Sequence, residues 1–240
     1  FFNGLANGAA VIIAQYYGAK DRKSLHVGLH TAYLFSIVIS LIVSLVGTVL
    51  TPWLLTIMNT PQDMMADSTI YLRIYFMGIL FTLVYNMGAA IMRAVGDSRR
   101  PLLYLLVCCV MNIILDIVMV VGMKMGIAGA ALATVISQCV SAILVTWSLT
   151  RAYDAMKLKF RELRMDARVL KKELKIGVPG ALQACAYGVT NVVIQASVNS
   201  FGTDTAAGWA AYGKLDLIFW TVSSALGAAV TTFAGQNYGA

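Results

Sequence analysis

Long runs of apolar residues, separated by short clusters of charged residues, dominate this chain. No Asp, Glu, Lys or Arg occurs in seven stretches: 1–19, 24–62, 74–92, 101–115, 125–150, 176–203 and 217–240. A helix needs about 20 apolar residues to cross the roughly 30 Å core of a bilayer, and each stretch reaches or approaches that length. The stretches lack the alternation of barrel strands and therefore predict helices. We expect seven membrane spans, near residues 1–18, 31–58, 70–93, 101–122, 126–150, 175–200 and 206–235.

The composition supports an all-α, polytopic transmembrane bundle. Of 240 residues, 59% are hydrophobic and 12% are charged, and the mean hydropathy is +0.76. Soluble domains carry roughly twice that charge, so the balance excludes a disordered chain and an ordinary soluble enzyme. Cys108, Cys109, Cys139 and Cys185 all lie in apolar runs without metal-binding or redox spacing, and are interpreted as small core residues.

The basic residues predict the orientation. Fifteen of the 18 lie after the first, third and fifth predicted spans, in segments 20–30, 93–101 and 151–175. Positively charged loops stay in the cytoplasm, so we expect these segments inside a multi-pass protein of the plasma membrane. They also account for most of the net charge of +7. Such loops contact anionic membrane lipids, and no nucleic-acid motif accompanies them, so we expect lipid contacts and no nucleic-acid partner.

The basic segment 151–175 divides the chain into residues 1–150, with five predicted spans, and 176–240, with two. Leu163, Ala167, Leu170 and Leu174 recur at helical spacing among basic residues. This pattern predicts a short amphipathic helix on the inner membrane surface, and 151–162 fits a solvated loop equally well. Phe1 lies within an apolar run and Ala240 directly follows one, so we expect the chain to be part of a longer protein.

An internal repeat links the two ends of the chain. Gln15-Tyr-Tyr-Gly18-Ala19 recurs as Gln236-Asn-Tyr-Gly239-Ala240, so that Gln15 corresponds to Gln236 and Gly18 to Gly239. The copies lie six predicted spans apart, and an even number means that both helices run in the same direction. The repeat therefore predicts parallel lobes related by an axis along the membrane normal, as in some transporters. We expect each glycine to end its helix in a left-handed cap.

Several motifs in order along the chain resemble the multidrug and toxic compound extrusion (MATE) family. Besides the two repeat copies, they are Arg93-Ala-Val-Gly96-Asp97 with Pro101, Asn112-x-x-x-Asp116, Gly126-x-x-Gly129-Ala130-Ala131-x-Ala133-Thr134, and Gly177-x-Pro179 with Gln183. The resemblance implies a twelve-helix exporter with two six-helix lobes around a central cavity. On that map the chain holds helices two to eight: 1–150 belongs to the first lobe, 151–175 is a cytoplasmic linker, and 176–240 begins the second lobe.

Asp116 is the strongest candidate for chemistry. It is the one acidic residue deep within the span 101–122, and a charge at the bilayer centre costs about 2.5–3.5 kcal/mol on insertion scales. Asn112 lies one turn earlier on the same helix face and could hydrogen-bond it. Such a carboxylate favours an ion or proton path, with a structural interhelical contact as the alternative. The resemblance adds Asn86 and Thr134 to this cation-coupling or substrate site.

The last span carries a second set of candidates. Lys214 and Asp216 lie within it, and Trp209 and Tyr212 could line a pocket for flat, lipophilic cations. Gln183 on the preceding span is added by the resemblance. The alternatives are that the charged groups snorkel to the outer interface and that the aromatic rings face lipid.

The preferred function is a cation-gradient-driven exporter of drugs or other toxic, lipophilic cationic compounds, working by alternating access. The alternative is a lipid-linked saccharide flippase of similar architecture. We expect no cofactor beyond a coupling ion, H⁺ or Na⁺, and a monomer when complete. An intramembrane enzyme would need a paired second carboxylate, a His pair or a Ser/His set within the spans. It is not favoured, because the two histidines, His26 and His30, both lie near a basic loop. A receptor or a structural membrane protein is not favoured either, because the parallel repeat is typical of transporters.

Overall fold

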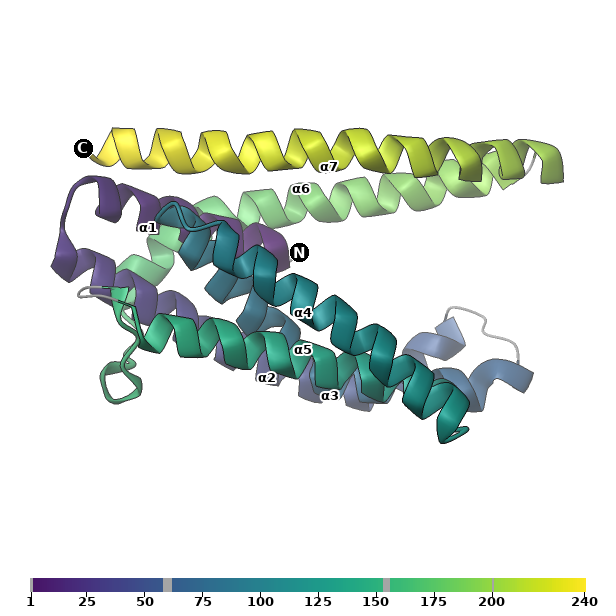
Figure 1. Cartoon of the computed structure of the whole chain (residues 1–240). Coiled ribbons are helices and arrows are strands. Elements are labelled where there is room, and N and C mark those ends of the chain that lie inside the picture. Colours follow the sequence, from purple (N-terminus) through teal and green to yellow (C-terminus); the bar gives the residue numbers. More distant parts are fainter. Residues whose placement is uncertain (1, 58–61, 153–155, 200) are drawn as a thin grey trace.

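The fold is all-α, and residues 2–57, 62–152, 156–199 and 201–240 are described by a computed structural model. Seven α-helices account for most of these residues (Figure 1). A short π-helical stretch, η1, extends α4, and a single 3₁₀ turn, η3, lies in the linker. The elements are α1 Phe2–Gly18, α2 Arg22–Ile57, α3 Gln62–Ala94, α4 Arg99–Asp116, η1 Ile117–Gly122, α5 Gly126–Thr150, η3 Phe160–Glu162, α6 Ala167–Asn199 and α7 Thr203–Gly239.

The seven helices coincide with the seven predicted spans. Five are long and apolar enough to cross a bilayer: α2, most of α3, α4 with η1, α5 and most of α7. The described part of α1 has 17 residues and falls just short of a full span. α6 carries more polar residues, including Gln183 and Asn191, and these lower its hydropathy.

The exposed surface confirms a membrane environment. Large apolar side chains cover the outward faces of α2 and of α4 with its extension η1, and Leu45, Val49 and Val121 are about 70% exposed. A soluble monomer rarely exposes contiguous apolar patches of more than a few hundred Å², because water makes them costly. The chain is therefore a multi-pass membrane protein, and the exposed apolar side chains of its helices face lipid.

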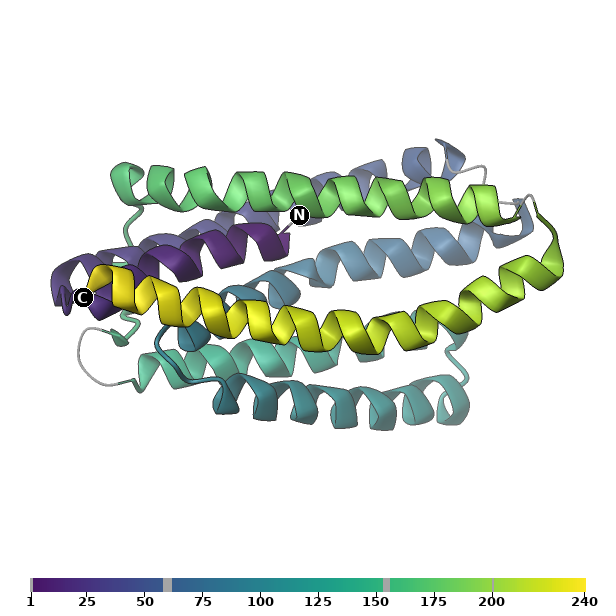
Figure 2. The same cartoon turned by 90° about the horizontal axis from the view of Figure 1, so that it is seen from above.

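The helices form a bundle of α1 to α5, with the α6–α7 hairpin along one side (Figures 1 and 2). Successive connections alternate between the two ends. The α1–α2 turn, the α3–α4 turn and the linker lie at one end. We call it the basic end, because these connections and the helix ends that adjoin them carry most of the basic residues. The chain's C-terminus lies at the same end, beside the α1–α2 turn.

The apolar core lies towards the basic end, between α1, α2, α3 and α5. Its members are buried side chains of these helices, among them Ile13, Leu29, Ile91 and Val145. Leu158 of the linker is also buried in it. The Tyr33 hydroxyl lies 2.6 Å from the Thr146 hydroxyl and so ties α2 to α5. The half of the bundle nearer the basic end is thus the better packed of the two.

The helix ends at the basic end use left-handed caps, but not where the repeat predicts them. Gly96, with φ +94°, ends α3: its N–H bonds to the Arg93 carbonyl, and the next N–H bonds to the Met92 carbonyl. α1 ends in the same way with Lys20, φ +56°, in the left-handed position. The expected cap at Gly18 is therefore wrong, and so is that at Gly239, because both glycines are the last residues of ordinary helices.

The amphipathic segment 163–174, in the second half of the predicted linker, is not a separate surface helix. α6 begins at Ala167 and runs without a break to Asn199. Asp166 precedes it and accepts hydrogen bonds from the N–H groups of Arg168 and Val169. This capping starts the helix well before the predicted span at 175. The helix then continues into the apolar run, with Pro179 inside it.

Candidate functional site

Asp116 lies where α4 changes from α-helical to π-helical geometry. Its Oδ1 atom is buried and has no hydrogen-bond partner in the described part of the chain. The Nδ2 atom of Asn112, one turn earlier, is buried and unpartnered in the same sense. Buried polar atoms are nearly always paired, and an unpaired one costs about 1–3 kcal/mol. Two such atoms on one helix face form a site that an ion, a proton or a ligand could satisfy.

The π-helical stretch after Asp116 is a feature that the sequence did not predict. Residues Ile117–Gly122 adopt it, and the N–H of Met123 closes it by bonding to the Val118 carbonyl at 2.8 Å. A π-helix bonds each residue to the fifth one before it, so it is wider than an α-helix and turns side chains away from their usual positions. Short π-helices recur at functional sites, and this one begins directly at the candidate carboxylate.

Thr134 and Asn86 lie at different depths in the bundle. α5 packs against α4 and its extension η1, with Gly129 against the Met119 backbone of η1. Thr134 therefore lies along α5 near the level of Asn112 and Asp116. Its hydroxyl donates to the Ala130 carbonyl at 3.0 Å.

Asn86 follows a different register. α3 packs against α5 with Gly78 at Val135 and Gly88 at Val145. Asn86 is therefore level with residue 143, about 13 Å along the axis from Thr134 at roughly 1.5 Å per residue. It lines a small cavity with residues of α1 and α2, including Phe2, Leu5 and Ser36. The four-residue cluster stays a prediction.

The candidates on α6 and α7 are on exposed faces of these helices. Gln183 and Lys214 are exposed, and Trp209 packs on Tyr212 with 5.3 Å between ring centres. The Tyr212 hydroxyl donates to Asp216 Oδ1 at 3.3 Å, which gives that carboxylate a partner one turn away. Across the hairpin, Tyr187 of α6 meets Trp220 edge to face at 6.0 Å. These rings form an aromatic surface, and its use as a cavity wall stays a prediction.

The two copies of the repeat are in direct contact. A Cβ atom added to Gly18 of α1 would collide with the Gln236 backbone of α7, and one added to Gly239 would collide with the Gln15 backbone. Between these contacts, a Cβ on Gly235 would lie 3.0 Å from the Cβ of Ala14. Ala14 and Gly235 are themselves equivalent positions of the repeat, each directly preceding its glutamine. The contact is therefore reciprocal, as a two-fold axis between parallel helices requires.

We call this contact, formed by Ala14, Gln15 and Gly18 with Gly235, Gln236 and Gly239, the repeat seam. Its glycines serve close backbone approach, the role that small residues have between membrane helices, and not helix capping. The sequence showed that the two segments match but not that they are in contact. Two segments so far apart in the sequence come into contact only when the helices between them have packed.

The amide of Gln236 extends the repeat seam to α3. Its Nε2 donates to the Ala94 carbonyl at 2.8 Å, one of the last carbonyls of α3 that would otherwise lack a partner. A cavity of about 530 Å³ opens beside this bond, between the Arg93–Ser98 turn and small residues of α7. The bond ties the second repeat copy to the end of a helix in the first part of the chain.

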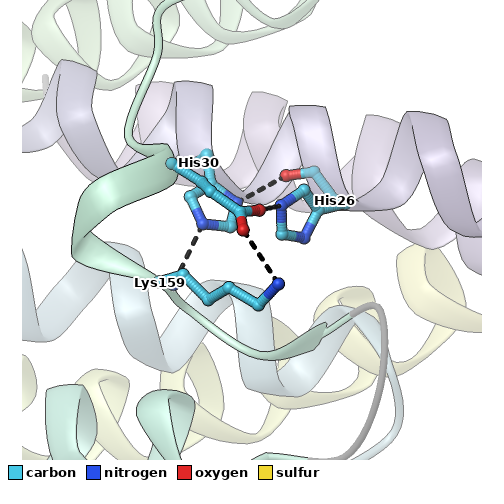
Figure 3. Close-up of polar contacts among 4 residues, drawn as sticks. His26, His30 and Lys159 are labelled. Atoms are coloured by element: carbon cyan, nitrogen blue, oxygen red, sulfur yellow. Dashed lines mark hydrogen bonds and ion pairs between the residues drawn. The ribbon is translucent and has the colours of Figure 1, made fainter.

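The linker is bound to the start of α2 by two histidines (Figure 3). His26 Nε2 lies 2.7 Å from Glu162 Oε2, and the other carboxylate oxygen of Glu162 accepts from Lys159 Nζ at 2.9 Å. The backbone N–H of Lys159 donates to His30 Nε2 at 3.0 Å. His30 Nδ1 lies 2.7 Å from the His26 carbonyl, so it carries the proton and the ring is neutral.

These contacts fix the linker electrostatically at the basic end. The hydrogen bonds from Lys159 and then His26 hold the pKa of the Glu162 carboxyl below its ordinary value. Thr31 adds a backbone contact, because its hydroxyl accepts from the Asp166 N–H at 3.1 Å. Segment 156–166 is therefore an ordered strap and not a free loop.

Comparisons with known proteins agree with this architecture. Residues 1–118 match the family model MatE. The whole chain aligns at 30% identity with a probable multidrug resistance protein of Bacillus subtilis, YoeA, and at 32% with a second one, YpnP. In both alignments the chain spans about half of the relative, 53% of its length.

A solved structure shares the fold. The crystal structure of MATE in the bent conformation superposes with a TM-score of 0.91 over 99% of this chain and 54% of that chain, at 22% identity. The arrangement of α1 to α7 is thus that of about half of a two-lobed, parallel-repeat fold, and the reciprocal repeat seam is consistent with it. The division into residues 1–150, 151–175 and 176–240 stays a prediction. From the family model over residues 1–118 and the two alignments, which cover the whole of this chain and about half of each relative, the chain belongs to the multidrug and toxic compound extrusion (MATE) family.

Proposed function

We propose that the protein exports drugs or other lipophilic cationic compounds in exchange for H⁺ or Na⁺. The observation that carries the proposal is the pair of buried, unpartnered polar atoms of Asp116 and Asn112 in a membrane-spanning helix. A carboxylate there is costly unless it binds a proton or a cation, so binding that ion changes the free energy of the helix around it. The π-helical stretch beginning at Asp116 supplies a segment that such a change could repack.

The repeat seam supplies the second requirement, two lobes that can rock about a fixed site. α1 and α7 contact each other through glycines at the basic end. We propose that this contact closes the basic end of the complete transporter. Contacts through small residues hold helices by close packing and not by interlocked side chains, and they can separate as rigid bodies. We propose that opening the repeat seam exposes the central site to the cytoplasm.

The cargo is proposed from the relatives and from the exposed faces of the α6–α7 hairpin. YoeA and YpnP are described as probable multidrug resistance proteins. The aromatic rings of Trp209, Tyr212 and Trp220 suit flat cations, which bind over ring faces. A lipid-linked saccharide flippase would need a wide cationic groove, and Lys214 is the one basic residue of α7. Drug export is therefore preferred.

The orientation and setting follow the charges. We propose that the basic end faces the cytoplasm, because positively charged loops are retained there. The protein then lies in the plasma membrane with segments 20–30, 93–101 and 151–175 inside, beside anionic lipid headgroups. It acts on small molecules, and the complete transporter is proposed to work as a monomer.

The test is Asp116→Asn in the full-length protein. The amide keeps the size and the hydrogen-bonding capacity but removes the charge and the proton site. We expect expression and membrane insertion to be unchanged, and gradient-driven efflux of a fluorescent cationic dye from cells to be lost. Efflux measured with and without Na⁺ or a protonophore identifies the coupling ion. Undiminished efflux by the variant would make Asp116 a structural contact and remove the proposed mechanism.

A further inference from the structure

α1 and α6 cross at very close range. A Cβ added to Gly8 of α1 would lie 2.5 Å from the Gly177 Cα of α6 and 2.6 Å from the Glu173 carbonyl oxygen, and one added to Gly4 would lie 2.5 Å from the Ala181 Cα. Ala181 is fully buried. α1 lies before the linker and α6 after it, so this crossing joins the two parts of the chain that move apart if the lobes rock.

A carboxyl group is buried at this crossing. The Glu173 residue is only 3% exposed, and its Oε1 atom has no hydrogen-bond partner in the described residues. It precedes the predicted span that begins at 175, yet α1 covers it. The loss of hydration on burial raises the pKa of Glu173 to about 8.

The charged groups nearby do not offset this burial. α1 carries no acidic, basic or histidine residue between 2 and 18. Lys172, next to Glu173, directs its Nζ to the Tyr16 hydroxyl of α1 at 3.3 Å. In the described part of the chain, three helices pack against α6, and their ionisable groups, with those of α6 itself, can be named in full. They are Tyr16 and Tyr17 of α1; Arg22, Lys23, His26, His30 and Tyr33 of α2; Asp204, Tyr212, Lys214, Asp216 and Tyr238 of α7; and Arg168, Lys171, Lys172, Lys175, Cys185 and Tyr187 of α6. None of them contributes to the raised pKa of Glu173, whose cause is desolvation.

We propose that Glu173 is a second proton-binding site, separate from Asp116, and that its neutral form is required for α1 and α6 to close against each other. A buried carboxylate without a partner is strongly unfavourable, whereas the neutral acid fits a dry crossing. Ionisation of Glu173 drives water into the crossing and separates the two helices. The inference rests on the proposed function only in assuming that the lobes move.

The direction of the pH effect follows from proton linkage. When the crossing is open, Glu173 meets water and its pKa returns towards the ordinary value of 4.5. Because the pKa is raised in the closed form, closure is fully favoured below the ordinary value and is lost as the pH rises through about 8. Between these limits the closed-to-open ratio falls about tenfold per pH unit, hence up to roughly a thousandfold from pH 5 to pH 8.

The experiment measures the separation of α1 and α6 directly. Spin labels replace the exposed Tyr17 and Lys171 in full-length protein whose four native cysteines have been substituted, reconstituted in lipid nanodiscs. Distances are recorded by pulsed electron paramagnetic resonance between pH 5 and pH 9, without drug or gradient. We expect one short distance at pH 5 and a growing longer population towards pH 9.

Three variants separate Glu173 from other titrating groups. Glu173→Gln should keep the short distance at every pH, because the amide cannot ionise, and Glu173→Asp should retain a pH response. Glu162→Gln, an exposed carboxylate on the linker, is the matched control and should respond like the wild type. A wild-type distance that does not change from pH 5 to pH 9, or a Glu173→Gln protein that still responds, overturns the inference.

The outcome is distinguishable from that of the export proposal. If dye efflux depends on Asp116 while Glu173→Gln leaves the pH response intact, only the second proton site is wrong. If the pH response requires Glu173 while no dye is exported, the export proposal fails and the proton site stands.

Discussion

Replacing Gly18 by Ala should open the repeat seam. The added carbon would lie 2.6 Å from the carbonyl carbon and 2.8 Å from the Cα of Gln236. Carbon atoms in ordinary contact are about 3.5–4.0 Å apart. The obstacle is backbone within a helix, so no side chain can rotate away and the helices must separate by about 1 Å to restore ordinary contact.

The cost of this separation sets the size of the effect. Forcing an extra methyl group into a packed contact costs about 1–3 kcal/mol. If that cost falls on the closed form alone, the equilibrium between closed and open seams shifts by roughly 5- to 150-fold. Gly239→Ala should act similarly, because its added carbon would lie 2.8 Å from the Gln15 carbonyl carbon. The double variant should cost less than the sum of the two, because one separation accommodates both methyl groups.

The assay places spin labels at Tyr17 and Tyr238, which are exposed and occupy equivalent positions in the two repeat copies. We expect Gly18→Ala to broaden this distance distribution and shift it to longer values. Gly227→Ala is the matched control on α7, because no atom lies within 4 Å of its added carbon. If Gly18→Ala and Gly227→Ala give the same distances and the same thermal stability, the close approach at the repeat seam is not real and the reasoning fails.

Two further predictions concern the basic end. Gly96→Ala should lower the free energy of unfolding by about 1–2 kcal/mol because φ is +94° there, although the added carbon meets no atom. Gly208→Ala, equally open but inside α7 with ordinary φ, should raise it by about 0.5–1 kcal/mol. Equal melting temperatures of the two variants would exclude strain at the cap. The depressed pKa of Glu162 means that its ionised form stabilises the strap above its ordinary pKa and that this contribution is lost as the pH falls through the lower, folded-state value. Proteolysis within 156–166 should therefore accelerate at pH 4 relative to pH 7 in the wild type but not in Glu162→Gln, and an identical pH dependence in both proteins would contradict this assignment.

The sequence by itself determined the number of helices and the order of their ends. Apolar runs of at least about 20 residues can be satisfied in lipid only as helices, so their lengths alone predict the spans. The alternation of basic connections, as at Lys20 and Arg93, predicted which turns share an end, and the described structure places them together. The spacing of Gln15 and Gln236 predicted parallel repeats, because direction follows from counting crossings.

Tertiary packing decided what these residues do. Gly18 looked like a helix cap because a glycine before a basic loop commonly is one, but its close neighbour is the backbone of Gln236 near the other end of the chain, which no local pattern reveals. Glu173 looked like one more charge in a basic amphipathic segment. Only the position of α1 across it removes its water, and burial is a property of three-dimensional neighbours and not of sequence. The π-helical stretch after Asp116 was not predicted either, because the hydropathy of these residues is the same whether they form an α-helix or a π-helix.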